Sequence, residues 1–232
     1  MPASLSGRPA DDASPPAFNA PAVVLWLAGI TISLHLLRIL LPDNAQFELV
    51  QRFGFIAARY AVDGAYAADP LAYLAGPVGH VFLHAGWGHL FLNMAFLVAF
   101  GAAVARRMSA APFLLLYFAS AVAGAFFWAW LEPVSTVPLV GASGGISGLV
   151  GAIGMLSLRT ELGGPLGDRR TAIAFVAVWL GTNLLIGLLP FSIPFEGGDI
   201  AWEAHIAGFV AGALLIRIFD GRGRPRPSTD AS

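Results

Sequence analysis

The stretch VGASGGISGLVGA, residues 140–152, lies within an apolar run long enough to cross a membrane, yet five of its thirteen residues are Gly. Two more, Ser143 and Ser147, carry hydroxyl groups. Gly and Ser both weaken helices in water, so their density in an apolar helix needs a physical reason. Small residues let helix backbones approach closely inside a bilayer. The stretch therefore predicts a membrane helix with a small, closely packed face that carries a hydroxyl group.

The composition indicates a membrane protein. The chain has 232 residues, of which 57% are hydrophobic and 12% are charged, and its mean hydropathy is +0.73. Soluble domains carry about 25% charged residues. Long unbroken apolar runs, rather than short alternating segments, favour a helical protein over a β-barrel. The absence of Cys excludes disulfides and thiolate catalysis.

Six membrane spans are predicted, each near the ~20 residues that cross a bilayer. They are residues 21–41, 78–100, 112–131, 138–158, 171–192 and 201–219. The first is interpreted as a retained helix rather than a signal peptide. The predicted fold class is all-α, a polytopic six-helix membrane domain over residues 21–219. The tails, residues 1–20 and 220–232, are expected to be disordered and cytoplasmic.

The arginines orient the predicted bundle. One side would hold ten of them: Arg8, Arg106, Arg107, Arg159, Arg169, Arg170, Arg217, Arg222, Arg224 and Arg226. Three others, Arg38, Arg52 and Arg59, lie in or near the connection between the first two spans. By the positive-inside rule, both termini are cytoplasmic (N-in, C-in). Within residues 42–77, the segment FELVQRFGFIAARY has apolar residues at helical spacing and predicts one amphipathic interfacial helix.

Polar residues inside the spans converge on one depth. His89 and Asn93 are placed about three turns into the second span, and Ser143 and His205 about one turn into the fourth and sixth. All three spans begin at the outer surface in this topology, so these groups fall in the outer half of the bilayer. Polar residues within a membrane are costly and mark functional sites.

This set of residues permits acyl transfer. His205 can act as the base that activates Ser143, provided that the backbones are close enough for a contact of ~2.6–3.2 Å. Small residues on both helices, among them Gly141, Gly144 and Gly208, predict that close approach. Glu203 is two residues from His205 and points to another face, so a Ser–His dyad is expected. His89, Asn93 and the Ser143 backbone N–H are candidate oxyanion donors.

Three motifs in order, HLFLN at 89–93, GASG at 141–144 and AHIAG at 204–208, resemble those of the rhomboid intramembrane serine proteases. The resemblance covers nearly all of residues 21–219. It implies that Ser143 is the nucleophile and His205 the general base. It also implies that His89, Asn93 and the Ser143 amide form the oxyanion hole. His80 and His84, which precede His89 in the same pattern, are expected to brace the outer loop.

The resemblance also implies partners and a reaction. Its members cleave single-pass membrane proteins at or near the outer ends of their helices and use no metal or other cofactor. Partners would therefore be such substrates and the lipid bilayer. No basic cluster is interleaved with aromatic residues, which argues against nucleic acid. A bacterial inner membrane is the expected location, and the oligomeric state is left open.

The sequence departs from the family pattern at three places. Ala75-Gly76 stands where many members carry Trp-Arg, and Ala105 where many carry an acidic residue. Ser147 stands where many members carry an aromatic residue that packs under the catalytic His.

The segment PFSIPFEGGD, 190–199, has two Pro and two Gly and predicts an irregular loop. This loop and the Trp179 end of the fifth span are expected to move aside for a substrate helix.

Two other functions remain open at this stage. One is a catalytically inactive rhomboid-like protein that binds and hands over membrane helices; such relatives usually lack the Ser or the His, and both are present here. The other is a transporter or channel that uses His89, Asn93 and His205 as a polar path. A transporter would favour acidic residues deep in the spans and internal repeats, and neither is visible.

Overall fold

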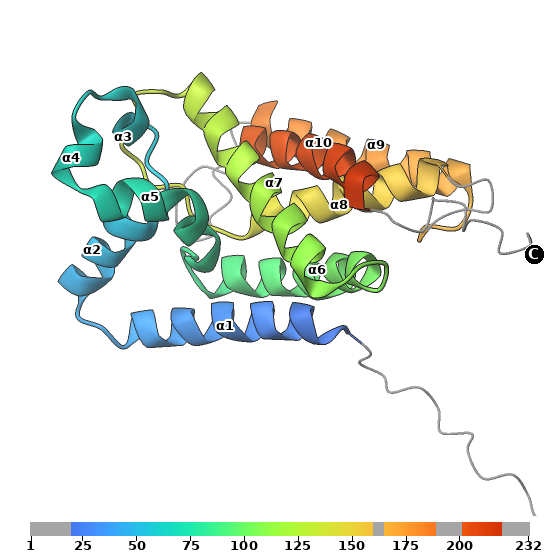
Figure 1. The fold of residues 1–232 in the computed structure, drawn as a ribbon, viewed down its shortest axis with the longest axis horizontal. Helices are drawn as coiled ribbons and strands as arrows, with labels where there is room; N and C mark the ends of the chain where they lie inside the picture. The colour runs from blue at the N-terminus through green and yellow to red at the C-terminus, as the bar shows by residue number, and fades with distance from the viewer. Residues whose placement is uncertain (1–19, 160–164, 189–200, 220–232) are drawn as a thin grey trace, which may run out of the picture.

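The structure is a computed structural model that describes residues 20–159, 165–188 and 201–219, and these ranges contain helices and no β-strand (Figure 1). Six helices are long: α1 (Ala22–Ile39), α6 (Trp87–Ala105), α7 (Ala110–Leu131), α8 (Ser143–Arg159), α9 (Arg169–Leu188) and α10 (Trp202–Phe219). They correspond to the six predicted spans. The all-α polytopic fold class is therefore confirmed.

Four of the described helices, α1, α6, α7 and α10, are long and apolar enough by themselves to cross a membrane. The other two long helices differ for reasons visible in their sequences. The α8 helix has 17 residues and is diluted by glycine, whereas α9 begins with two arginines. Because α8 is buried among the other helices, its own residues need little apolar surface to face lipid.

Two predicted boundaries were wrong. The second span begins at Trp87 rather than at residue 78, because residues 70–82 form a separate helix, α5 (Pro70–Gly79), and a 3₁₀ turn, η1 (His80–Phe82). The fourth helix begins at Ser143 rather than at residue 138. The predicted end of the fifth span, the loop at 190–199 and nearly all of both tails lie outside the described residues.

The single amphipathic helix expected within residues 42–77 was also wrong. The segment holds α2 (Asp43–Phe53), α3 (Ala58–Ala61), α4 (Ala65–Ala68) and the start of α5. The α2 helix ends because Gly54 is extended, and Phe55 then forms an antiparallel bridge with Leu139 through N···O contacts of 3.1 and 2.8 Å. Phe55 is fully buried. Phe55 fitted the helical spacing of apolar residues because its side chain is buried, and not because the helix continues through it.

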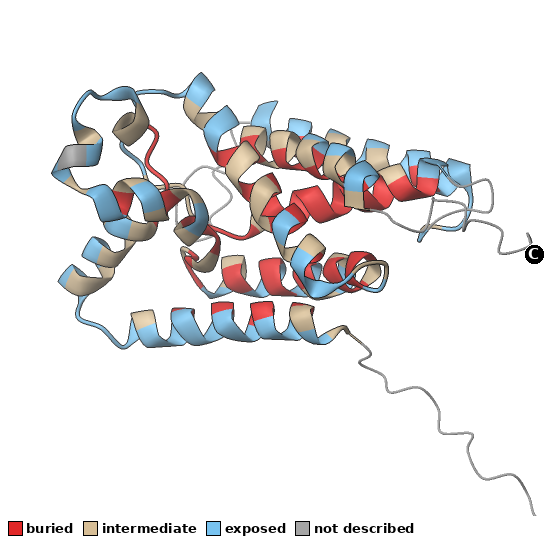
Figure 2. Ribbon diagram, viewed as in Figure 1, coloured by how far each residue is buried: buried red, intermediate tan, exposed pale blue. Residues whose placement is uncertain are grey.

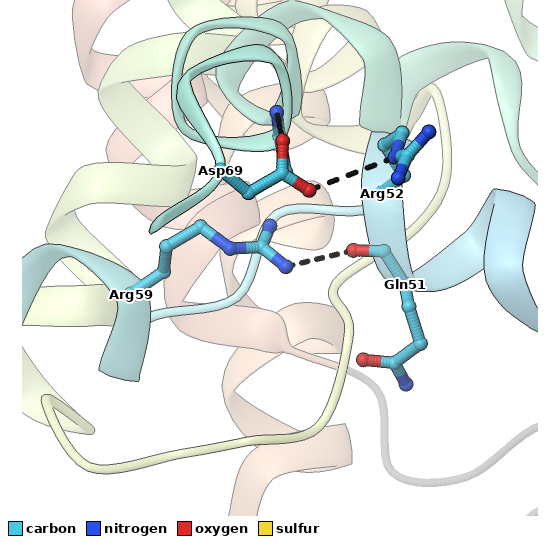
Figure 3. A network of polar contacts seen from close by, with 5 residues as sticks. Gln51, Arg52, Arg59 and Asp69 are labelled. Atoms are coloured by element: carbon cyan, nitrogen blue, oxygen red, sulfur yellow. Dashed lines mark hydrogen bonds and ion pairs between the residues drawn. The ribbon is translucent and has the colours of Figure 1, made fainter. Parts of the chain in front are cut away.

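Polar contacts join the short helices to one another (Figure 3). Asp69 Oδ1 accepts a hydrogen bond from Ala72 N at 3.0 Å and caps α5, while its Oδ2 lies 3.6 Å from Arg52 Nε on α2. Arg59 donates to the Gln51 carbonyl at 2.8 Å. Arg52 and Asp69 are about half exposed, so their ion pair adds little stability. These contacts position α5, which leads into the segment before α6.

The core of the protein surrounds α8. Figure 2 shows buried residues along nearly the whole of α8, whereas α1 buries only the face toward α6. The α8 helix packs against α7, α10 and α6, and Figure 1 shows α8 and α10 running side by side. The functional residues predicted on α6, α8 and α10 therefore lie on helices that pack around one centre.

Glycines allow the closest of these contacts. A Cβ atom at Gly208 would overlap the Gly144 carbonyl, and one at Gly212 would overlap the Gly148 carbonyl. On α7, a Cβ at Gly124 would lie 2.5 Å from the Ala204 carbonyl oxygen. Backbones this close leave no room for a side chain, which is the small-residue packing common in membranes. The Gly-rich stretch of the sequence therefore serves to bring α8 and α10 together.

Candidate active site

Ser143 is the first residue of α8, and hydrogen bonds hold the backbone of the two residues before it. Gly141 has φ +123°, a conformation that L side chains rarely adopt. Its N–H donates to the His80 carbonyl at 2.9 Å, and Ala142 N–H donates to His84 Nε2 at 3.4 Å. The first backbone N–H groups of a helix have no partner within it. The Ser143 N–H thus belongs to a helix end that favours negative charge.

His205 lies in the first turn of α10 and faces Ser143. The distance from His205 Nε2 to Ser143 Oγ is 2.8 Å, which is a hydrogen bond. Both residues are partly buried. The contact depends on the close approach described above, because Gly208 lies three residues after His205 and packs on Gly144, the neighbour of Ser143. The structure thus brings together the two residues that the sequence singled out as nucleophile and base.

A third polar residue contacts the other side of the His205 ring. Asn183 Oδ1 on α9 lies 2.8 Å from His205 Nδ1, and Asn183 Nδ2 donates to the Trp179 carbonyl at 2.8 Å. The Asn183 side chain is buried, with 6% of its surface exposed. The sequence predicts a dyad, and Asn183 is not among the residues singled out from it. The available signal was an amide inside the fifth predicted span, where a polar side chain is costly.

His89 and Asn93 lie one turn apart near the start of α6, and His89 is in its first turn rather than three turns in. That depth prediction was wrong because the helix starts later than expected. The corrected position agrees better with those of Ser143 and His205, which also lie in first turns. Asn93 Nδ2 donates to the His89 carbonyl at 2.9 Å, which leaves its second amide proton for another acceptor.

The His89 ring borders the space next to Ser143. His89 Nδ1 accepts from Ala85 N–H at 3.4 Å, so the ring proton resides on Nε2 when His89 is neutral. A Cβ built on Gly141 would lie 2.8 Å from His89 Nε2 and 3.7 Å from Ser143 Oγ. The donor edge of His89 and the Ser143 hydroxyl therefore flank the same small volume, which only a glycine at 141 leaves open.

His80 and His84 contact the segment that precedes Ser143. His80 Nδ1 donates to the Gly76 carbonyl at 3.1 Å, and the His80 carbonyl accepts from Gly141. Arg38 Nη2 on α1 donates to the His84 carbonyl at 2.8 Å, a contact that the sequence analysis missed. These are the contacts that a bracing role requires. A Cβ added at Gly76 would lie 3.1 Å from the Gly54 carbonyl oxygen, so the two backbone segments pack closely here.

Ser147, the second hydroxyl of the opening stretch, is fully buried one turn after Ser143. Within the described structure its Oγ has no hydrogen-bond partner. The described hydrogen bonds of the His205 ring are made by Ser143 and Asn183 instead. The described residues likewise contain no cluster of three or more His, Cys, Asp or Glu that could hold a metal ion.

The fold and this site define an integral, multi-pass membrane protein in which a serine at a helix start faces a histidine on the neighbouring helix. The rhomboid domain model matches residues 74–221. This range contains all four residues predicted for the reaction: His89, Asn93, Ser143 and His205. The chain belongs to the rhomboid family.

Three relatives illustrate the range of the family. The putative rhomboid protease YdcA of Bacillus subtilis is 33% identical over 138 residues, which are 58% of this chain and 62% of that protein. The mitochondrial rhomboid protein 1 of Saccharomyces cerevisiae is 29% identical over 143 residues, 59% of this chain and 39% of that protein. The inactive RHOMBOID-like protein 8 of Arabidopsis thaliana is 30% identical over 129 residues, 56% of this chain and 33% of that protein.

These matches cover less than two thirds of the length of each relative. Their names place one relative in mitochondria, and the three come from a bacterium, a yeast and a plant. The membrane location of this chain follows from its family and its apolar helices. The bacterial inner membrane stays a prediction.

Proposed function

We propose that this protein is an intramembrane serine endopeptidase. The observation that carries the proposal is the 2.8 Å hydrogen bond between Ser143 Oγ and His205 Nε2. A serine hydroxyl is a weak nucleophile until an adjacent base removes its proton, and nucleophile and base within hydrogen-bond distance are the diagnostic geometry. Relatives named as proteases support the same conclusion.

The reaction follows from the positions of the groups. Ser143 Oγ attacks the carbonyl carbon of a peptide bond while His205 Nε2 takes the hydroxyl proton. His205 then gives that proton to the leaving amine, and an ester between Ser143 and the substrate remains. Water, deprotonated by His205, hydrolyses the ester and releases Ser143.

The negative charge that forms on the substrate oxygen needs nearby donors. The Ser143 N–H at the start of α8, the His89 Nε2–H and the second amide proton of Asn93 are proposed to supply them. Removal of one such donor typically lowers kcat by about 10²–10³-fold. The His89→Ala and Asn93→Ala variants are therefore expected to keep measurable but much weaker activity.

The substrates are proposed to be single-pass membrane proteins, cleaved at or near the outer ends of their helices. His89, Ser143 and His205 lie in the first turns of α6, α8 and α10, and Asn93 lies one turn further on, so these groups share one end of the bundle. The arginine distribution predicts that this end faces the outer surface, with both termini in the cytoplasm. Water can reach such a site without crossing the membrane core.

Substrate entry is proposed to occur between α6 and α9. The Trp179 ring on α9 contacts Phe96 and Phe100 on α6, with ring centroids 6.1 and 5.9 Å apart. Because the chain has no Cys, a Phe96→Cys, Trp179→Cys double variant can be crosslinked selectively with a short thiol reagent. Crosslinking is expected to abolish cleavage, and a cleavable linker should restore it. Full activity of the crosslinked protein would contradict this entry route.

The test of the function is cleavage of a single-pass model substrate by the purified full chain in detergent. Ser143→Ala should abolish cleavage, and Ser147→Ala, a matched change one turn along α8, should not. The second candidate function is binding and handing over helices without cleavage, and one relative named as inactive shows that a family member need not be a protease. Substrate binding without cleavage by a folded wild-type protein would establish that function instead.

A further inference from the structure

We propose that Asn183 is a positioning residue that fixes the orientation and tautomer of His205, so that Ser143, His205 and Asn183 act as one linked set. The inference rests on the proposed hydrolase function and extends it to α9, which carries none of the residues predicted for the reaction. It starts from the contact at 2.8 Å between Asn183 Oδ1 and His205 Nδ1.

The orientation of the Asn183 amide is fixed by its second contact. The Trp179 carbonyl, 2.8 Å from Asn183 Nδ2, can only accept a hydrogen bond. The amide must therefore direct its NH₂ group toward Trp179 and its Oδ1 toward His205. The reverse orientation would bring two carbonyl oxygens together and lose the hydrogen bond to Trp179.

The orientation of the amide in turn fixes the histidine. An amide oxygen can only accept, so His205 Nδ1 must carry the ring proton. Neutral His205 then has its lone pair on Nε2, the atom 2.8 Å from Ser143 Oγ. A base needs that lone pair to take the serine proton. The state of one histidine nitrogen is set by the hydrogen bond made by the other.

An amide suits this buried position better than a carboxylate would. Asn183 has only 6% of its surface exposed, and a carboxylate at such a position inside a membrane protein would be costly unless it were paired. A neutral acceptor orients the ring without that cost. A Cys–His–Asn arrangement in papain-like proteases shows that an amide can serve in this position.

The surroundings of His205 leave this role open. Ser147, one turn after Ser143, is where the family resemblance implies an aromatic residue packed under the catalytic His. The Ser147 side chain is small and fully buried, and it makes no described hydrogen bond to the ring. Asn183 from α9 makes the described hydrogen bond to the ring nitrogen opposite the one that faces Ser143.

The contact also links the chemistry to the packing of α9. The Trp179 carbonyl accepts from Asn183, and the Trp179 ring contacts Phe96 on α6. Displacement of this part of α9 would release both the α6 contact and the His205 ring. Proton transfer from Ser143 to His205 therefore requires that α9 has returned to the position seen in the structure.

The test compares Asn183→Leu, which has a similar size but no acceptor, with Asn183→Asp, which keeps an acceptor oxygen. Thr182→Val is the matched control, because Thr182 is the exposed neighbour of Asn183 on α9. Kinetics on a single-pass substrate should show kcat lowered by about 10-fold or more in Asn183→Leu, with KM changed by less than about 2-fold. Asn183→Asp should regain part of the loss, and Thr182→Val should match the wild type.

The second readout does not depend on activity. Nitrogen NMR of protein labelled with ¹⁵N-histidine reports which ring nitrogen is protonated, and His205→Gln identifies the signal among the five histidines. Wild-type His205 should carry its proton on Nδ1, and Asn183→Leu should lose that preference. Protonation on Nε2 in the wild type, or an unchanged tautomer in Asn183→Leu, would overturn the proposal. If the wild type cleaves nothing, the hydrolase function fails, and the NMR result still decides the role of Asn183.

Discussion

The α8–α10 pair and the α9 helix contribute to the same site through opposite kinds of packing. Between α8 and α10, backbones meet so closely that a Cβ at Gly208 would overlap the Gly144 carbonyl. On α9, a Cβ at Gly181 would meet nothing within 4 Å, and among its described side chains only Ala172 and Asn183 are buried. The nucleophile and base thus lie on helices whose backbones are in direct contact, and the residue proposed to orient the base lies on a helix with few buried side chains.

This difference suggests that one interface fixes the catalytic distances and the other admits the substrate. Catalytic distances must be held within about 0.5 Å, which suits an interface with no spare volume. A substrate helix must also enter from the lipid, which suits a helix held by aromatic side chains and a few hydrogen bonds. The same substitution should therefore have very different effects on the two sides of the site.

The largest effect is expected for Gly208→Ala. The added methyl group must push α10 away from the Gly144 backbone, and backbone cannot yield as a flexible side chain can. Overpacking of this kind costs about 1–3 kcal/mol of stability. A shift near 1 Å between Ser143 and His205 should lower kcat by about 100-fold.

The matched change on the other side is Gly181→Ala. Its methyl group meets open space, and Ala favours a helix over Gly by about 0.5–1 kcal/mol. Wild-type cleavage and an equal or higher thermal midpoint are expected. If the two variants lost activity equally, the contrast between the interfaces would be wrong.

A smaller loss is expected for Gly141→Ala, which tests the segment that delivers Ser143. The backbone at Gly141 has φ +123°, where a side chain costs about 1–3 kcal/mol of strain. The new Cβ would also lie 2.8 Å from the His89 ring. A drop in kcat of about 10-fold or more is expected, since His89 must move away from the oxyanion position. Unchanged kcat would argue against a role for His89 as donor.

A modest gain in stability is expected for Ser147→Ala. Within the described structure the Ser147 hydroxyl is fully buried without a partner, and an unsatisfied buried polar group costs about 1–3 kcal/mol. Its removal should raise the thermal midpoint and leave cleavage intact. Loss of cleavage would show that Ser147 takes part in the reaction.

The smallest effect is expected at the far end of α9. Hydrogen bonds from Thr171 and the Arg170 N–H lower the pKa of Asp168 below its usual value of 3.8. Because the folded pKa is the lower one, this contribution is complete above the ordinary carboxyl range and is lost as the pH falls through the lowered folded pKa. Asp168→Ala should lower the thermal midpoint slightly at pH 7 and not at strongly acidic pH. An equal difference at both pH values would exclude the charged cap.

Most of the interface between α8 and α10 could be predicted from the sequence. Ser143, His205 and the glycines between them form local patterns on single helices, and small residues have one clear physical use in a membrane. Boundaries were less accurate, because apolar residues continue on both sides of η1, so that Gly79 and Gly86, which flank the turn, were included in one span.

Asn183 could not be assigned from the sequence for a different reason. Its partner lies on another helix, and nothing in the spacing of α9 indicates which face turns toward His205. The bridge between Phe55 and Leu139 has the same character, since it joins residues far apart in the chain. Contacts between distant segments depend on tertiary packing, which periodicity within a segment does not report.

The central claim is that Ser143 is a nucleophile activated by His205, and covalent labelling tests it most directly. The purified full chain would be treated with a phosphonofluoridate, which reacts with activated serine hydroxyls, and digested for mass spectrometry. A single adduct on Ser143, absent in His205→Ala, is the predicted result. An adduct on Ser147, or equal labelling of Ser143 with and without His205, would contradict the account.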